Sequence, residues 1–217
     1  MTEPRPPAAR PAARVMVVIP VRALEGAKSR LGETLDAEER RDLVTRLLEK
    51  TIAAARGAAR VDSIVVVSPD ADTLALAEAA GVRALAQHGG GLNAAVEQAR
   101  DLALAEGAGA LLVLPGDLPF VGGPAIDAFL AATDPDDLPF VALVPDRHGR
   151  GTNALFLRPP DVIASAFGGD SRDAHEHRAR AAGAGYLAWN GPLRIDIDTP
   201  DDLLLVDAMT RAHERVP

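Results

Sequence analysis

The sequence predicts a single α/β domain with a mainly parallel central sheet. Residues 15–20 and 111–114 form uninterrupted apolar runs, as strands do when helices cover both faces of a parallel sheet. Segments with helical apolar spacing separate such runs along the chain. The 217 residues, of which 47% are hydrophobic, suffice for one large core.

The first half of the chain alternates strand and helix signals. Runs of Val, Ile and Leu mark the strands. Asp36 and Glu39, in capping-box spacing, open the first long helix, and Gly81 closes the next one. The expected elements are strand 15–20, helix 36–56, strand 63–68, helix 71–80, a weak strand 82–85 and helix 91–106.

The second half begins with the strand 111–114, which we expect at the centre of the sheet. The turn at 146–153 is either an anion-binding turn or a plain hairpin. In a final strand, side-chain alternation would place Asp196 and Asp198 on one face. The expected elements are strand 111–114, helix 124–132, strands 140–145 and 154–157, helix 171–182, strands 186–189 and 193–198, and a closing helix capped by Thr199.

Composition excludes several classes of function. A net charge of −8, a pI near 5.1 and 3% aromatic residues argue against a nucleic-acid partner and against an anionic membrane surface. The absence of cysteine excludes thiol chemistry and fits a reducing, cytoplasmic setting. Residues 1–14, rich in Pro and Arg, predict a disordered tail before a domain at 15–217, and no apolar run is long enough to span a membrane.

Acidic residues are the first candidates for a site. Asp117 follows the central strand, at the sheet edge where open α/β proteins bind ligands. It is either a metal ligand or a residue that caps its own turn. Asp196 and Asp198 would lie side by side, which is unfavourable without a cation. We therefore favour a metal site formed by all three carboxylates, although a capping role for Asp198 is credible.

Cations and glycine-rich turns supply candidate anion sites. Arg22, Lys28 and Arg30 lie in the loop after the first strand, where they either bind phosphate or are solvated. Asn93 follows a glycine run that could let backbone approach a nucleotide but lacks both the dinucleotide fingerprint and the P-loop spacing, so spacing alone favours an ordinary mobile loop. Ser171 opens a helix, either as part of an anion site or as a cap.

The chain contains none of the common hydrolase motifs, such as H-E-x-x-H or G-x-S-x-G. Transfer of a nucleotidyl group to an acceptor that is already a phosphate needs no general base, because the second pKa of a phosphate ester is about 6. Positioning and charge neutralisation by Mg²⁺ and a few cations then suffice.

Several motifs together resemble one known family, the 2-phospho-L-lactate or phosphoenolpyruvate guanylyltransferases of coenzyme F420 biosynthesis. The resemblance runs from Val15 to about Asp207. It rests on PVRAL at 20–24, AKSRL at 27–31, GLNAA at 91–95, PGDLP at 115–119, DRHG at 146–149, GTNAL at 151–155, Phe167-Gly168 with Ser171 and His175, and DIDTP at 196–200.

The resemblance implies a three-layer fold like that of nucleotide-diphospho-sugar transferases. It also implies transfer of GMP from GTP to phosphoenolpyruvate or 2-phospho-L-lactate, with release of pyrophosphate. The roles it implies are Thr152, Gly168 and Ser171 for the acceptor, Asp117, Asp198 and Asp196 for Mg²⁺, Asp117, Lys28 and Arg30 for catalysis, and Arg22, Lys28, Arg30, Ser68, Pro69 and Asn93 for the nucleotide.

Three positions depart from the family pattern: Arg22, where Lys is frequent, Arg150, where Thr is usual, and Gly169, where Pro is common. The Arg- and Ala-rich composition with few lysines resembles the bacterial branch of the family, and this resemblance implies phosphoenolpyruvate as the acceptor. The alternatives are a molybdopterin or sugar-phosphate nucleotidyltransferase on the same fold, and a non-catalytic nucleotide-binding protein. The sequence leaves the oligomeric state open, and a homodimer is compatible with it.

Overall fold

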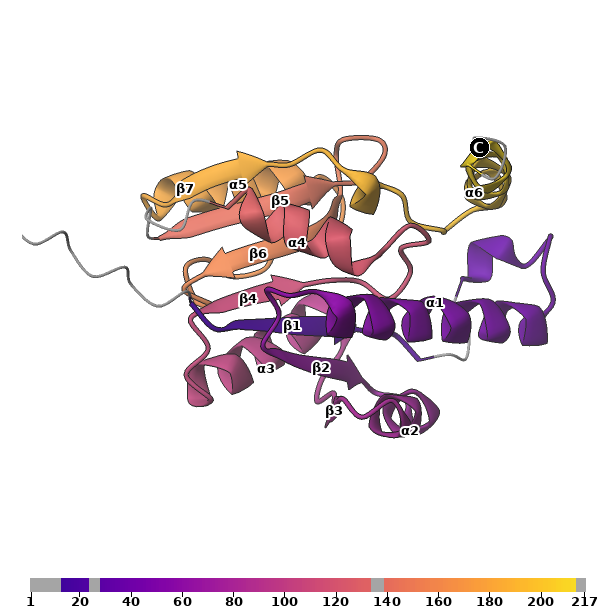
Figure 1. Ribbon diagram of the computed structural model, residues 1–217, viewed down its shortest axis with the longest axis horizontal. Helices are drawn as coiled ribbons and strands as arrows, with labels where there is room; N and C mark the ends of the chain where they lie inside the picture. Colours follow the sequence, from indigo (N-terminus) through magenta and orange to yellow (C-terminus); the bar gives the residue numbers. More distant parts are fainter. Residues whose placement is uncertain (1–12, 24–27, 134–138, 214–217) are drawn as a thin grey trace, which may run out of the picture.

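The computed structural model describes residues 13–23, 28–133 and 139–213, except for the side chain of His213. Seven strands form one sheet in the order β3-β2-β1-β4-β6-β5-β7 (Figure 1). They are β1 (Val15–Pro20), β2 (Ser63–Ser68), β3 (Arg83–Ala86), β4 (Ala110–Val113), β5 (Phe140–Pro145), β6 (Thr152–Arg158) and β7 (Gly185–Ala188). Strand β6 runs antiparallel to both of its neighbours and the other pairs are parallel, so the predicted mainly parallel sheet is confirmed.

Helices cover both faces of this sheet. The helical segments are η1 (Ser29–Leu31), α1 (Ala37–Gly57), α2 (Ala71–Ala79), α3 (Gly91–Ala105), α4 (Gly123–Ala131), α5 (Ser171–Ala181), η2 (Pro192–Arg194) and α6 (Pro200–His213). In Figure 1, α1 and α4 lie on one face, α3 and α5 on the other, and α6 stands beyond the end of the sheet. The predicted capping box at Asp36 and Glu39 is present, with both hydrogen bonds formed.

The two faces of the sheet have separate cores, as strands buried on both sides require. In β1, Val17 and Ile19 pack into the core under α1 and α4, whereas Met16 and Val18 pack into the core under α3. This period of two places successive side chains on opposite faces. Strand β4 is the fourth of seven and fully buried, which confirms that the run at 111–114 is central.

The topology gathers several chain segments at one edge of the sheet. Strands β1, β4 and β5 end at this edge, and the antiparallel strand β6 begins there with Thr152. The turn between β5 and β6 joins two antiparallel strands as a hairpin, and anion binding by this turn stays a prediction. Residues from both halves of the sequence can therefore meet at a common site.

The predicted strand at 193–198 is wrong. Residues 192–194 form the 3-10 helix η2, because Pro192 lacks an N–H for a strand ladder and Arg194 N–H donates to Gly191 O. The next four residues belong to no helix or strand; there, Ile197 N–H donates to Asp117 O at 3.3 Å. Ile197 is nevertheless buried against Leu31 and Leu47, so the expected alternation with Asp196 and Asp198 persists.

Within the described part of the chain, no helix combines the length and the apolar character that a membrane span needs. A disordered tail is expected at residues 1–14, and of these, residues 1–12 lie outside the described part of the chain.

Candidate active site

A pocket of about 640 Å³ opens at the edge of the sheet where β1 and β4 end. Residues of the loop after β1, of the segment after β4, of β6 and of the approach to α6 line it. Seven of the predicted site residues line it: Arg22, Lys28, Arg30, Asp117, Thr152, Asp196 and Asp198.

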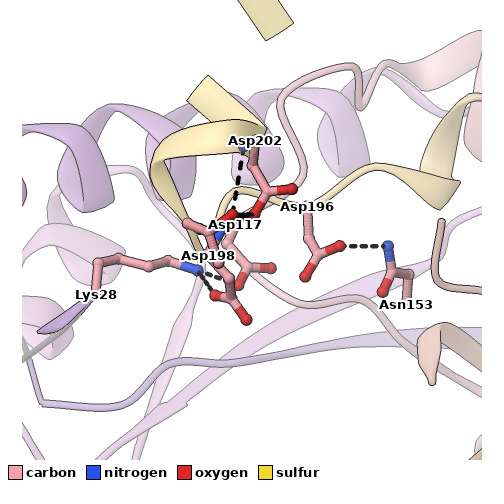
Figure 2. Close-up of polar contacts among 7 residues, drawn as sticks. Lys28, Asp117, Asn153, Asp196, Asp198 and Asp202 are labelled. Atoms are coloured by element: carbon pink, nitrogen blue, oxygen red, sulfur yellow. Dashed lines mark hydrogen bonds and ion pairs between the residues drawn. The ribbon is translucent and has the colours of Figure 1, made fainter. Parts of the chain in front are cut away.

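Lys28 holds two of the carboxylates together. Its Nζ lies 2.6 Å from Asp117 Oδ2 and 2.7 Å from Asp198 Oδ1 (Figure 2). Burial lowers the pKa of Lys28, but the two carboxylates outweigh that effect and raise it to about 12. The Lys28 backbone has φ 53, a left-handed conformation that non-glycine residues seldom adopt. Lys28 is therefore a fixed positive charge in the pocket.

Asp196 lies beside this ion-paired group, and no cation among the described residues forms an ion pair with it. Its carboxylate accepts a hydrogen bond from Asn153 Nδ2 at 3.3 Å (Figure 2). Burial, followed by the charges of Asp117 and Asp198, raises the pKa of Asp196 to about 6. Burial and the two neighbouring carboxylates thus disfavour the charged form of Asp196, and Lys28 offsets this only in part.

Asp202 shapes the segment that carries Asp198. Its buried carboxylate accepts hydrogen bonds from Asp198 N–H at 3.0 Å and from the N–H and hydroxyl of Thr199 at 2.7 Å each. It also forms an ion pair with Arg147, 2.8 Å away, from the β5–β6 turn. Although burial raises the pKa of Asp202, these hydrogen bonds and Arg147 hold it below its ordinary value.

Of the three residues predicted to bind the acceptor, Thr152 shares the pocket lining with the carboxylates, Ser171 contacts Thr152, and Gly168 is not in the lining. Thr152 lines the pocket, and Ser171 Oγ is 3.1 Å from Thr152 Oγ1. Gly168 has φ 137, a conformation that favours glycine, although a Cβ at this position would meet no atom within 4 Å. Gly168 is therefore required by backbone conformation and not by space.

The structure does not bring the predicted nucleoside residues into the pocket lining. Ser68 is fully buried, and its Oγ accepts from Asp70 N–H at 3.1 Å. The Asn93 amide bonds the backbone of Phe167, accepting from its N–H at 2.8 Å and donating to its carbonyl at 2.9 Å. Nucleoside binding by Ser68, Pro69 and Asn93 stays a prediction.

The carboxylates fit a divalent cation by their chemistry. Carboxylate oxygens are the ligands that Mg²⁺ prefers, and the charges of Asp117 and Asp198 contribute, after burial, to the raised pKa of Asp196. In the present arrangement, no three acidic or histidine side chains of the described residues form a group that could hold a metal ion, and Lys28 Nζ bonds both Asp117 and Asp198.

Sequence reasoning assigned no site role to Asn153, Asp202 and Arg147. The spacing of Thr199 and Asp202 is that of a capping box with a carboxylate at its third helical position, a signal that could have identified Asp202. No local sequence pattern links Arg147 to Asp202, because this ion-pair partner lies 55 positions further along the chain.

The fold is of the nucleotide-diphospho-sugar transferase type. A candidate nucleotide-diphospho-sugar transferase from Desulfovibrio desulfuricans G20 superposes with a TM-score of 0.70 at 20% identity, over 94% of this chain and 89% of that one. A 4-diphosphocytidyl-2C-methyl-D-erythritol synthase superposes with a TM-score of 0.64 at 14% identity, over 93% and 100% of the two chains.

Within that class the sequence identifies the family. Residues 15–212 match the model of the family described as "Guanylyl transferase CofC like", and the chain belongs to it. The phosphoenolpyruvate guanylyltransferase of Sphaerobacter thermophilus is 45% identical over 87% of this chain and 90% of its own length. That of Rubrobacter xylanophilus is 41% identical over 89% and 94%. The resemblance inferred from the motifs is confirmed.

Proposed function

We propose that this protein transfers GMP from GTP to phosphoenolpyruvate and releases pyrophosphate, as a step in coenzyme F420 biosynthesis. The observation that carries the proposal is the meeting of Asp117, Asp196, Asp198 and Lys28 in one pocket beside Thr152. The names of the relatives from Sphaerobacter and Rubrobacter support phosphoenolpyruvate as the acceptor.

Asp117 and Asp198, supported by Asp196, would hold Mg²⁺. When bound, the ion would neutralise negative charge on the α-phosphate and on the departing pyrophosphate. Asn153 orients Asp196, and Asp202 orients the backbone that carries Asp198. Lys28, fully charged at neutral pH because its pKa is about 12, would contact phosphate oxygens in the same pocket.

The proposed reaction exchanges one phosphoanhydride bond for another. An oxygen of the acceptor phosphate attacks the α-phosphorus of GTP, and the bond from that phosphorus to the β-phosphate oxygen breaks. Because the acceptor phosphate is largely dianionic at neutral pH, with its second pKa near 6, no side chain has to remove a proton. Arg22 and Arg30, which line the pocket, would bind the triphosphate, and Thr152, Gly168 and Ser171 would bind the acceptor.

A pyrophosphate-release assay tests this function. GTP, ATP and CTP are each combined with phosphoenolpyruvate, 2-phospho-L-lactate or 3-phosphoglycerate in the presence of Mg²⁺. We expect the highest kcat/KM for GTP with phosphoenolpyruvate. Preference for another acceptor would change the assigned substrate, and the absence of pyrophosphate release with every pair would refute the proposed reaction.

A further inference from the structure

His175 lies behind the two hydroxyl groups of the predicted acceptor site. It stands one helical turn after Ser171 on α5, so both side chains leave the same face of the helix. Its ring is fully buried, and Nδ1 lies 3.1 Å from Thr152 Oγ1. The comparisons and the proposed mechanism assign this histidine no role.

The surrounding backbone selects one tautomer of His175. Ala166 N–H donates to Nε2 at 2.9 Å, and a backbone N–H is always a donor. Nε2 must therefore be unprotonated, and the ring proton of a neutral imidazole must be on Nδ1. Burial and the nearby Arg178 lower the pKa of His175 to about 4, which agrees with a neutral ring at pH 7.

The tautomer sets the direction of the hydroxyl protons. Nδ1–H donates to Thr152 Oγ1, which is also hydrogen-bonded to Ser171 Oγ at 3.1 Å. The two hydroxyls have two protons, and one of them forms the bond between them. The other proton has no acceptor among these three side chains, so it is available to a ligand in the pocket that Thr152 lines.

We propose that His175 is a positioning residue for the acceptor, because it makes the Thr152–Ser171 pair a hydrogen-bond donor toward an anionic group. Its bond to Ala166 also holds the backbone that leads to Gly168, and Asn93 holds Phe167 between them. A carboxylate has acceptors and no donor when ionised, so it suits this pair. The inference rests on the proposed function, since it takes Thr152 and Ser171 as the acceptor site.

Three substitutions separate the two bonds of His175. The amide nitrogen of Asn can occupy the place of Nδ1, so His175→Asn retains a donor to Thr152. The amide oxygen of Gln can reach the place of Nε2, so His175→Gln retains the acceptor for Ala166 and loses the donor. His175→Phe loses both. His177→Gln, at an exposed position on the same helix, is the matched control.

Steady-state kinetics with phosphoenolpyruvate and GTP give the first readout. We expect the KM for phosphoenolpyruvate to rise roughly tenfold in His175→Gln and His175→Phe, less in His175→Asn, and not in the control, while the KM for GTP changes by about twofold or less. Equal increases in both KM values, or an Asn variant as impaired as the Phe variant, would overturn the proposal. Circular dichroism verifies that each variant is folded.

Nitrogen-15 NMR of the wild-type ring tests the network independently of turnover. We expect a neutral His175 with the proton on Nδ1 at pH 7, and the loss of this signal in His175→Gln identifies it. A proton on Nε2, or a charged ring, would refute the inference even if the enzyme is active. If NMR shows the expected tautomer but the enzyme releases no pyrophosphate with any acceptor, the proposed function is refuted, whereas the hydrogen-bond network of His175 is confirmed.

Discussion

At the scale of single residues, Asp117 lies near one positively charged side chain and one negatively charged side chain. Lys28 contacts it at 2.6 Å, and Asp196 lies close enough for the Asp117 charge to raise its pKa. The ion pair offsets part of the repulsion among the carboxylates. The role of Asp117 is therefore electrostatic in the free protein and, on our proposal, metal-binding during catalysis.

Replacing Asp117 by Asn should abolish most of the activity and keep the fold. The amide removes a negative charge that we assign to Mg²⁺, and we expect kcat/KM to fall by at least about a hundredfold, the upper range for supporting residues around metals. Pyrophosphate release measures the loss, and urea denaturation verifies the fold.

Asp72→Asn is the control for that experiment, because Asp72 is 71% exposed and pairs with Arg41 on the surface. It should leave kcat/KM unchanged. Near-normal pyrophosphate release by Asp117→Asn would defeat the assignment of Asp117.

Ser171→Ala should raise the KM for the acceptor more than the KM for GTP. Ser171 hydrogen-bonds Thr152, the acceptor residue in the pocket lining. Because Thr152 keeps its own hydroxyl, we expect a rise of roughly three- to tenfold in the KM for phosphoenolpyruvate. A larger effect on the KM for GTP would move the acceptor site elsewhere.

Asp196 should cost stability in the absence of metal. Its folded-state pKa is about 6, above the ordinary 3.8, so the folded state binds more protons between these pH values. The stability contributed by the protonated carboxyl is present at low pH and is lost as pH rises through about 6. Asp196→Asn should therefore be more stable than wild type by on the order of 1 kcal/mol at pH 7.

Urea denaturation in EDTA measures this difference at pH 7 and pH 4. His175 titrates in the same range but is present in both proteins, so its effect cancels in the comparison. We expect the advantage of Asp196→Asn to shrink at pH 4, and a difference that is independent of pH would contradict the electrostatic explanation.

At the scale of elements, the start of α6 aims Asp198 into the pocket. The Asp202 carboxylate satisfies donors of Asp198 and Thr199 and pairs with Arg147 of the β5–β6 turn. The buried Asp202 side chain thus links α6, the segment that carries Asp198, and the β5–β6 hairpin. Such a residue positions a ligand without contacting the substrate.

Asp202→Ala should destabilise the protein by about 2 to 4 kcal/mol, because it leaves buried donors and Arg147 without their acceptor. It should also raise the Mg²⁺ concentration needed for half-maximal activity. Asp201→Ala, the exposed neighbouring position, is the control and should do neither. Unchanged Mg²⁺ dependence in Asp202→Ala would limit Asp202 to a structural role.

At the scale of the whole molecule, an acidic protein binds an acidic substrate by local charge. The net charge is −8, whereas Arg22, Lys28 and Arg30 gather at the pocket. Long-range attraction of GTP is therefore not expected, and on our proposal binding depends on these cations together with a metal ion.

GTP with Mg²⁺ should stabilise the protein more than either alone. At about a hundredfold excess over Kd, binding contributes about 2.7 kcal/mol, which for a chain of this size raises Tm by about 5 to 10 °C. Differential scanning fluorimetry with GTP, Mg²⁺, both, and ATP with Mg²⁺ measures this. Equal shifts by GTP with and without Mg²⁺ would favour a non-catalytic nucleotide-binding protein.

The sequence alone determined the fold class, most of the elements and the family. Apolar runs such as 15–20 and 111–114 are local signals of buried strands, and the capping box at Asp36 is local as well. It also identified the three carboxylates: Asp117 from its position after the central strand, and Asp196 and Asp198 from the alternation of side chains in an extended segment. That alternation does not require a paired strand, which is why Asp196 and Asp198 were placed together correctly within a strand that does not exist.

The tertiary structure alone decided which groups touch. Lys28 contacts partners 89 and 170 positions away, Asp202 meets Arg147, and the proton of His175 is directed by Ala166. No local pattern encodes such contacts, because they depend on how β1, β4 and β6 align at one edge of the sheet. The commitment of Asn93 to the backbone of Phe167 has the same origin, since it requires α3 to pack beside the segment that leads to α5.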